Sequence, residues 1–363
     1  MPLDRIQGMS VYPQMIGARS GSGNQAEHLG PARATADAER VRVTVPARLH
    51  FGFVDLNGGL GRRFGSLGVG LEAPLTRVTL TRAPQLQVSG HDADRARRYL
   101  ATVAAHYGLD DRLALSVESS IPPHAGLGSG TQLALSVGMA AATFYGLDID
   151  GRDVARLLDR GARSSVGIAT FATGGVVLDG GRGSGEEAPP ILSRFDFPEP
   201  WRILLIFDQD ATGLHGEAER EAFRRLPVFP EDRAAHLCRL VLMTALPALA
   251  ERDIARFGAA ITEMQRIMGD YFAPAQGGRF LSPRVTEALA WLEANDASGV
   301  GQSSWGPTGF ALLGSAAEAE RLLAGLEARW PAGSGLTFAV SRGRNRGGEI
   351  ERLPADLAAA DLS

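Results

Sequence analysis

The sequence predicts an α+β fold, and three observations support this class. Strand-like and helix-like segments mix along the chain, and the paired strands near its start are typical of antiparallel hairpins. Of the 363 residues, 44% are hydrophobic and 21% are charged, as in an ordinary soluble globular protein. No internal repeat is visible, and the length suggests two domains of roughly 150 residues each.

Ordered structure is expected to begin near residue 41. Residues 1–40 are polar and rich in Gly, Ala and Ser, without the apolar core of a signal peptide, and predict a disordered tail. Residues 41–56 (VRVTVPARLHFGFVDL) alternate like a strand. They break at a glycine-rich loop, residues 57–70, which leads to a second strand segment over 71–83.

The next segments alternate between helix and strand. Residues 92–109 have helical spacing, with Gly108 as the expected C-cap, and residues 113–123 predict a strand. A further helix is predicted over 150–165, with Asp150 as its N-cap.

The second half of the chain is mostly helical. Strands are predicted over 169–181 and 201–208, with a loop of Gly, Glu and Pro between them. The remaining expected elements are a long helical region over 233–269 interrupted at Pro247, strands over 305–314 and 336–341, and a helix over 316–330. We place a domain boundary near residue 200, which gives domains of residues 41–200 and 201–363.

Composition excludes several kinds of chemistry. All 37 basic residues are Arg, so Walker A phosphate sites, Schiff-base chemistry and Lys bases are excluded. The net charge of −4 gives no general attraction to nucleic acid or to anionic membranes. No apolar stretch approaches the roughly 18 uncharged residues of a membrane span. Cys238 has no partner for an internal disulfide; we expect it to be a small buried residue in a cytoplasmic protein.

A glycine-rich loop (IPPHAGLGSGTQ) leads directly into a predicted helix over residues 130–145. The start of a helix has unpaired amides and a partial positive charge, and glycine lets backbone approach a ligand closely. The hydroxyls of Ser129 and Thr131 add donors or metal contacts. The alternative is a turn that merely precedes a helix. The predicted anion-binding loop comprises Gly126, Leu127, Gly128, Ser129, Gly130 and Thr131.

Three stretches resemble the motifs of the GHMP kinase superfamily, in the same order. PPHAGLGSGTQLALSVG resembles the second motif, which binds nucleotide phosphates, PARLHFGFVDL takes the place of the first and GQSSWGPTGFALL that of the third. The resemblance implies a GHMP-type two-domain fold. Its N-terminal half would be like ribosomal protein S5 domain 2, and its C-terminal half would be ferredoxin-like.

The motifs depart from those of the kinases. The first motif has Arg48 and His50 but no Lys, and Gly167 and Ile168 fall where many members carry a catalytic Asp. A phosphoryl-transfer enzyme of this type uses that carboxylate to orient or deprotonate its acceptor. The odds of kinase activity are therefore lower.

Four stretches, including RLHFGFVDLNGGLGRRFGSLGVGLE and RSSVGIATFATGGVVLDGG, resemble the β-ribofuranosylaminobenzene 5′-phosphate synthase family, a non-kinase branch of this fold. That resemblance implies a decarboxylating phosphoribosyltransferase of methanopterin biosynthesis. It would condense 5-phosphoribosyl 1-diphosphate with 4-aminobenzoate or 4-hydroxybenzoate and release CO2 and diphosphate. Mg2+ is expected with the diphosphate, and the family implies a cytoplasmic homodimer that acts on small molecules only.

The charged candidates for this chemistry lie in or beside the motifs. We expect Arg48, His50 and Asp55 in catalytic roles, with Asp55 either holding Mg2+ or ribose hydroxyls or capping the following turn. The substrate-binding candidates outside the loop are Arg62, Arg63, Arg163, Ser164, Ser165 and Trp305. The metal ligands stay open among Ser129, Thr131 and Asp55. Each Arg has a solvent-exposed alternative, and core packing is the simpler role for Trp305.

Two other functions fit the same motifs. One is an ATP-dependent small-molecule kinase, and the other is a catalytically silent regulator that binds polyphosphate. The sequence does not separate the amino from the hydroxyl acceptor.

Overall fold

The computed structural model describes residues 40–185, 187–213 and 216–354, with the backbone alone for 216–220. All of them belong to one compact unit, which spans residues 31–363. The predicted tail, residues 1–40, lies outside the described residues except for Arg40, which begins the first strand.

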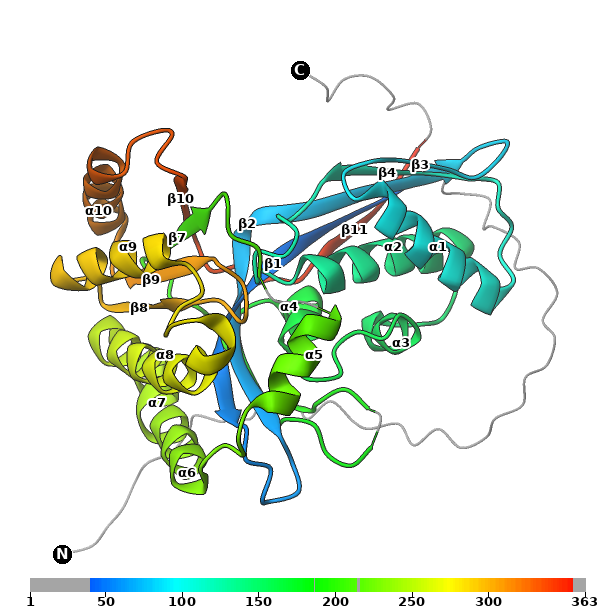
Figure 1. The fold of residues 1–363 in the computed structure, drawn as a ribbon. Helices are drawn as coiled ribbons and strands as arrows, with labels where there is room; N and C mark the ends of the chain where they lie inside the picture. Colours follow the sequence, from blue (N-terminus) through cyan, green and yellow to red (C-terminus); the bar gives the residue numbers. More distant parts are fainter. Residues whose placement is uncertain (1–39, 186, 214–215, 355–363) are drawn as a thin grey trace, which may run out of the picture. The chain divides into compact units, whose positions relative to one another are not determined.

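Among the described residues, seven strands form a sheet that is antiparallel except for the pair β3–β4 (Figure 1). Its members are β1 (Arg40–Asp55), β2 (Phe64–Arg82), β3 (Gln87–Gly90), β4 (Leu113–Ser119), β5 (Val176–Asp179), β6 (Ile191–Phe195) and β11 (Glu349–Leu353). The order is β11-β1-β2-β4-β3, and β5 pairs with both β2 and β6. The long β1–β2 hairpin therefore supports most of the sheet.

Four of the described helices accompany this sheet, and α2 packs directly on β1 and β2 (Figure 1). They are α1 (Ala93–Tyr107), α2 (Ser129–Tyr145), α3 (Gly151–Leu157) and α4 (Val166–Thr173). Most side chains of α2 are buried, because it lies between the sheet and the three other helices. Two predicted caps are confirmed. Gly108 ends α1 with a φ of 63°, and the Asp150 carboxylate accepts bonds from the first amides of α3.

A second antiparallel sheet follows, with the order β10-β7-β9-β8. Its strands are β7 (Arg202–Asp208), β8 (Gly299–Gln302), β9 (Gly309–Leu313) and β10 (Leu336–Ser341). The helices of this part are α5 (Gly216–Arg225), α6 (Glu231–Leu240), α7 (Leu246–Glu251), α8 (Ile254–Gln276), α9 (Pro283–Ala294) and α10 (Ala316–Arg329).

One hydrophobic core joins the two sheets. Phe51 of β1 lies 5.8 Å from Phe257 of α8 and 5.6 Å from Phe310 of β9, measured between ring centroids. All three side chains are fully buried. The second sheet begins at Arg202, and the division into domains near residue 200 stays a prediction.

Several local predictions are wrong. The strand expected over 169–181 begins only at Val176, because residues 166–173 form α4; this segment is buried, so periodicity does not separate helix from strand there. The loop expected over 57–70 already becomes β2 at Phe64. The expected loop between residues 182 and 200 contains strand β6, and the helix expected over 150–165 ends at Leu157. β6 is an edge strand with half-exposed and exposed side chains, so it lacks the buried alternation on which prediction relies. Cys238, expected to be buried, is exposed on α6.

The helical run does not end at Pro247, where we expected an interruption, but continues to Glu251 and stops at Arg252, which has a left-handed φ of 60°. A π-helical turn, η1 (Val241–Ala245), joins α6 to α7, and Pro247 lies in the first turn of α7. The run Glu231–Glu251 contains a window with a mean hydropathy of 1.3. By length and composition this is enough for a membrane span, so the expectation that no segment of the chain is apolar enough is wrong. Core helices of soluble proteins meet the same criterion, and 39% of this window is buried.

Asp208 connects the end of β7 to the start of α9. Its carboxylate accepts hydrogen bonds from the Ser282 hydroxyl (2.5 Å) and from two nitrogens of Arg284 (2.7 and 3.2 Å). Burial alone would raise the pKa of Asp208, but Ser282, the Asp210 amide and Arg284 together hold it below its usual value. The ionised carboxylate therefore stabilises the fold above about pH 4, and this stabilisation is lost as the pH falls through the lowered pKa.

We expect Asp208→Asn to lower the free energy of unfolding by about 2 kcal/mol near neutral pH, because the Ser282 hydroxyl and Arg284 lose a charged acceptor, although Arg284 keeps its second partner, Asp210 (2.6 Å). The deficit should shrink at a pH below the lowered pKa of Asp208, where the wild-type carboxylate is also protonated. Urea unfolding at the two pH values measures it. The exposed Asp210, changed to Asn, is the matched control with a smaller effect. An equal deficit at both pH values would contradict this account.

Candidate functional site

The loop between β4 and α2 has the conformation expected of an anion-binding site. Gly126 (φ 79°) and Gly128 (φ 80°) adopt the left-handed conformation that favours glycine. Gly128 is the N-cap of α2 and supplies no side-chain cap to the first turn. A helix start of this kind keeps its partial positive charge available to an anion.

Packing also requires these two glycines. A Cβ at Gly126 would lie 2.2 Å from the carbonyl oxygen of Ser303, and one at Gly128 would lie 2.9 Å from Cγ of Arg48. The protein's own atoms therefore occupy the space that we expected a ligand to need. Gly130 differs, because the nearest atom to a Cβ there is Nη1 of Arg95, 3.7 Å away.

One hydroxyl joins the three motif segments. Ser303, which is fully buried, donates from Oγ to the carbonyl of Gly126 (2.8 Å) and accepts from the backbone amide of His50 (3.0 Å). Arg48 adds a second link, with Nη1 2.6 Å from the same Gly126 carbonyl. The third motif therefore packs against the second and holds its loop in place.

A β-bulge sets the position of His50. His50 pairs with Gly68 and Gly52 with Leu67, so Phe51 is an extra residue in β1. The Phe51 carbonyl, released from the ladder, accepts a hydrogen bond from the Gln265 side chain.

His50 is buried and neutral. Burial, and then the nearby charge of Arg48, hold the pKa of His50 well below its usual value. Its ring lies 4.7 Å from that of Phe53. His50 also lines a cavity of about 30 Å³, and the other side chains around it include Phe53, Gln265, Phe272, Gln302 and Trp305.

Two arginines that the sequence analysis did not single out lie beside Gly130. Arg160 donates from Nη2 to the Tyr99 hydroxyl (2.8 Å), which is 3.4 Å from the Gly130 carbonyl. Arg95 of α1 approaches the same residue and pairs loosely with Asp92 (3.6 Å). Nothing in the sequence distinguishes these arginines from solvated ones, since only the packing of α1 and α3 on α2 brings them here.

The predicted arginines of the 57–70 loop bind the backbone. Arg62 donates from Nε and Nη2 to the carbonyls of Gly180 and Gly181 (both 2.7 Å), and Arg63 donates from Nε to the Leu56 carbonyl (2.8 Å). They order the loop, whatever ligand contacts their remaining nitrogens make.

Arg163 and Trp305 belong to an aromatic cluster. The guanidinium of Arg163 lies 5.1 Å from the Phe223 ring centroid. Trp305 is 4% exposed and contacts Phe223 (5.2 Å) and Phe272 (4.5 Å). Core packing, the simpler role expected for Trp305, describes this position, although Trp305 also lines the cavity beside His50.

Asp55 caps the turn that follows it. Its Oδ1 accepts from the amides of Asn57 (2.7 Å) and Gly58 (3.1 Å). Within the described residues, no three His, Cys, Asp or Glu side chains form a group that could hold a metal. Of the two roles weighed for Asp55, the turn cap is the one for which the structure has contacts.

Ser164 and Ser165 meet a buried carboxylate that we did not predict. Asp179 is fully buried and accepts from the Ser164 hydroxyl (3.1 Å), the Ser165 amide (2.8 Å), and the amides of Ser66 and Gly181 (both 3.0 Å). Burial raises the pKa of Asp179 against the effect of these donors. The acid in VVLDGG was the available sequence signal, an Asp at the end of an apolar strand.

Gly167, at the position where many members of the superfamily are expected to carry a catalytic Asp, makes a close packing contact instead. Gly167 lies in the first turn of α4, and a Cβ there would be 3.3 Å from Cγ2 of Thr131. Its carbonyl accepts from the buried Gln132 side chain (2.8 Å). Asp179 reaches the start of α4 instead, with both oxygens already bonded.

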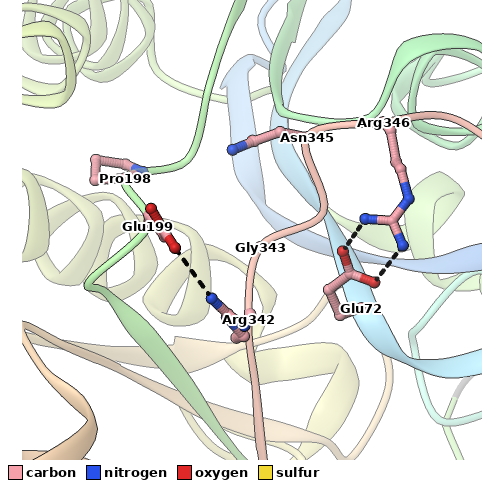
Figure 2. Close-up of a pocket in the computed structure, with 7 residues that line it drawn as sticks. All are labelled: Glu72, Pro198, Glu199, Arg342, Gly343, Asn345 and Arg346. Carbon is pink, nitrogen blue, oxygen red and sulfur yellow. Dashed lines mark hydrogen bonds and ion pairs between the residues drawn. The ribbon is translucent and has the colours of Figure 1, made fainter.

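A larger cavity, about 330 Å³, contains none of the predicted residues (Figure 2). It is lined by Glu72, Pro198, Glu199, Arg342, Gly343, Asn345 and Arg346. Its charges already pair with one another, Arg346 with Glu72 at 2.8 Å and Arg342 with Glu199 at 3.5 Å. We therefore place the candidate site at the start of α2.

Removing the Asp179 carboxylate should loosen the start of α4. In Asp179→Ala the buried amides of Ser66, Ser165 and Gly181 lose their acceptor, and we expect the free energy of unfolding to fall by roughly 3 kcal/mol. Hydrogen exchange at these three amides should accelerate. Asp196→Ala, at an exposed acid, is the control with an effect within about 0.5 kcal/mol. Unchanged protection in Asp179→Ala would refute the assignment.

Comparison with known proteins identifies the fold. Residues 94–175 match the family model for the GHMP kinases N terminal domain, and residues 245–332 match that for the GHMP kinases C terminal. A solved structure of L. major mevalonate kinase superposes with a TM-score of 0.64 at 15% identity, covering 87% of this chain and 98% of that one. Mevalonate diphosphate decarboxylase from Staphylococcus aureus superposes with a TM-score of 0.61 at 16% identity, covering 86% and 98%. The expected GHMP-type α+β fold is confirmed.

Two curated relatives identify the branch. Beta-ribofuranosylphenol 5′-phosphate synthase of Archaeoglobus fulgidus is 32% identical over 324 residues, which is 86% of this chain and 99% of that protein. The protein of the same name from Methanothermobacter thermautotrophicus is 30% identical over 287 residues, which is 73% of this chain and 86% of that protein. The chain therefore belongs to the β-ribofuranosylphenol 5′-phosphate synthase family, enzymes of the pentosyltransferase type on a GHMP kinase fold.

Proposed function

We propose that this enzyme condenses 5-phosphoribosyl 1-diphosphate with 4-hydroxybenzoate or 4-aminobenzoate, forming a C-riboside 5′-phosphate and releasing CO2 and diphosphate in methanopterin biosynthesis. The observation that carries the proposal is the start of α2, which has no side-chain cap and lies among Arg48, Arg95 and Arg160. The names of the relatives, ribofuranosylphenol phosphate synthases, support it.

The donor carries a diphosphate and a 5-phosphate, so it needs two anion-binding sites. The arginines near the candidate site form two clusters that can supply them. Arg48, Arg95 and Arg160 would hold the diphosphate, stabilising the charge that it gains as the glycosidic bond opens. Arg63 and Arg163 lie over Phe64 (5.6 Å) and Phe223 (5.1 Å), whose rings are 5.9 Å apart. We assign the second cluster to the other anions, the 5-phosphate or the acceptor carboxylate.

The reaction requires little covalent chemistry from the protein. The ring carbon that bears the carboxylate bonds to C1′ of the ribose while the bond from C1′ to the diphosphate breaks, and the diphosphate keeps that electron pair. The bond to the carboxylate carbon then breaks, CO2 leaves, and its electrons restore the aromatic ring. Alignment of the two substrates can contribute roughly 7–11 kcal/mol of barrier lowering.

The loop fits a magnesium ion that arrives with the diphosphate. Mg2+ binds phosphate oxygens and few protein ligands, and the hydroxyls of Ser129 and Thr131 lie in the first turn of α2. When bound, the ion would neutralise part of the leaving group's charge. Asp55 is less suited, because its Oδ1 already caps a turn.

We also propose a cytoplasmic homodimer with no nucleic-acid or membrane partner. Within the apolar run Glu231–Glu251, Leu242 (62% exposed) and Met243 (66% exposed) are the features that favour a protein contact. The size of the enzyme in solution tests this.

Release of label from carboxyl-labelled 4-hydroxybenzoate or 4-aminobenzoate, with phosphoribosyl diphosphate present, tests the reaction. We expect Gly130→Ala to fold normally, because its Cβ meets no atom closer than 3.7 Å, and to raise the KM for the donor about tenfold by crowding the diphosphate. Gly128→Val should abolish turnover, since its φ of 80° and the contact with Arg48 leave no room for a side chain. Gly185→Ala is the control, at a glycine outside the left-handed region whose Cβ would meet no atom closer than 4.0 Å.

The kinase alternative makes the opposite prediction. It requires ATP turnover with a small-molecule hydroxyl acceptor and no label release from either benzoate. Gly167 in place of the kinase carboxylate argues against it. Binding of diphosphate without turnover of any acceptor would instead indicate a silent regulator.

A further inference from the structure

Two buried nitrogens that line one cavity have no hydrogen-bond partner among the described residues. They are Nε2 of His50, a residue 2% exposed, and Nε1 of Trp305, a residue 4% exposed. Both residues line the cavity of about 30 Å³ described above. It lies near the point where the Ser303 hydroxyl joins the three motif segments. Because a buried polar atom left unpaired costs about 1–3 kcal/mol, two of them at one cavity indicate a ligand atom that enters it.

Apart from the Ser304 hydroxyl, the other polar side chains around this cavity are already engaged. Gln302 accepts from the Leu281 amide (2.6 Å) and donates to the Ser304 carbonyl (3.1 Å). Arg279 is paired with Asp270 (2.7 Å). His50 and Trp305 therefore define what the cavity recognises.

Their chemistry is complementary to a hydroxyl group. The Trp305 indole carries a hydrogen on Nε1 and only donates, whereas a neutral imidazole offers one nitrogen as an acceptor. A hydroxyl accepts and donates at the same oxygen. An aromatic amine accepts poorly, because its lone pair is delocalised into the ring. A volume of about 30 Å³ suits one group of the size of water and excludes an aromatic ring.

Resting on the proposed function, we infer that this cavity receives the para hydroxyl of 4-hydroxybenzoate, with Trp305 donating to its oxygen and His50 Nε2 accepting its proton. The hydrogen bonds of Ser303 support this placement of the acceptor hydroxyl. The amide of His50 and the carbonyl of Gly126 bind the same Ser303 hydroxyl. The cavity beside His50 therefore adjoins the predicted anion-binding loop, where we place the diphosphate.

The proton transfer balances with the reaction. As the para carbon bonds to C1′ and diphosphate leaves, the phenol oxygen feeds electrons into the ring and its proton moves to His50 Nε2. Loss of CO2 returns electrons to the ring and the oxygen, and the phenol recovers its proton from the imidazolium. The lowered pKa of His50 keeps the imidazole unprotonated near neutral pH, and the phenol becomes acidic enough to give it a proton only as the ring gains positive charge. Arg48 and Arg279 are the charges near it.

The test measures steady-state kinetics of His50→Gln and Trp305→Phe with 4-hydroxybenzoate and with 4-aminobenzoate. We expect His50→Gln to lower kcat/KM for 4-hydroxybenzoate about 100-fold or more and that for 4-aminobenzoate less than about tenfold. Trp305→Phe keeps the ring packing and should raise the KM for 4-hydroxybenzoate about tenfold, with the KM for the donor unchanged. His106→Gln, at an exposed His of α1, should behave like wild type.

The outcomes separate this inference from the proposed function. If wild type releases no CO2 from either benzoate, the function fails and the inference falls with it. If wild type uses 4-hydroxybenzoate and His50→Gln loses activity equally with both acceptors, or stays within about twofold of wild type, the inference alone is wrong. A solvent isotope effect on kcat with 4-hydroxybenzoate, reduced in His50→Gln, would support the proton transfer. Trp305→Phe gives an independent reading if His50→Gln does not fold.

Discussion

The buried hydroxyl of Ser303 holds the candidate site together. It is bonded at once to the Gly126 carbonyl and the His50 amide, residues 177 and 253 positions away in the sequence. The phosphate loop, the first strand and the turn before β9 therefore have fixed positions relative to one another. The loop also packs closely against the third motif segment. A side chain at Gly306 would not fit, since a Cβ there would lie 2.3 Å from the backbone of Ala125. These contacts hold the start of α2, where we propose that the diphosphate binds, in a fixed position.

In this chain, arginine alone takes the charged hydrogen-bonding roles that arginine and lysine share in other proteins. With no Lys in the chain, every cationic contact is a planar fork that can bond in several directions at once. Arg62 uses two of its nitrogens on two successive carbonyls, and Arg48 spans from β1 to the phosphate loop. These arginines order the backbone as well as providing charge. For this reason, a list of arginines near the motifs does not by itself separate ligand contacts from structural ones.

Two local features are consistent with the proposed function rather than with phosphoryl transfer. Gly167 packs α4 closely on α2 where a kinase would place a carboxylate, and the charge at that helix start comes from Asp179, which is fully hydrogen-bonded. In addition, the bulge at Phe51 places His50 in a buried position beside an aromatic cluster, where its pKa is lowered. A site with anion-binding backbone, a neutral imidazole and aromatic walls suits a reaction whose acceptor is a ring.

Some features were determined by the sequence alone. The positions of α2 and its loop, the left-handed glycines and the caps at Gly108 and Asp150 follow from local backbone chemistry, which short stretches of sequence carry. The three motifs in order were enough to predict the fold. Only the tertiary structure decided the rest. Three features depend on side chains far apart in the chain: Arg95 and Arg160 at Gly130, the carboxylate of Asp179 at Ser164, and the cavity where the unpartnered nitrogens of His50 and Trp305 lie. Their meeting depends on how helices and sheets pack, and a single sequence carries no direct record of that packing.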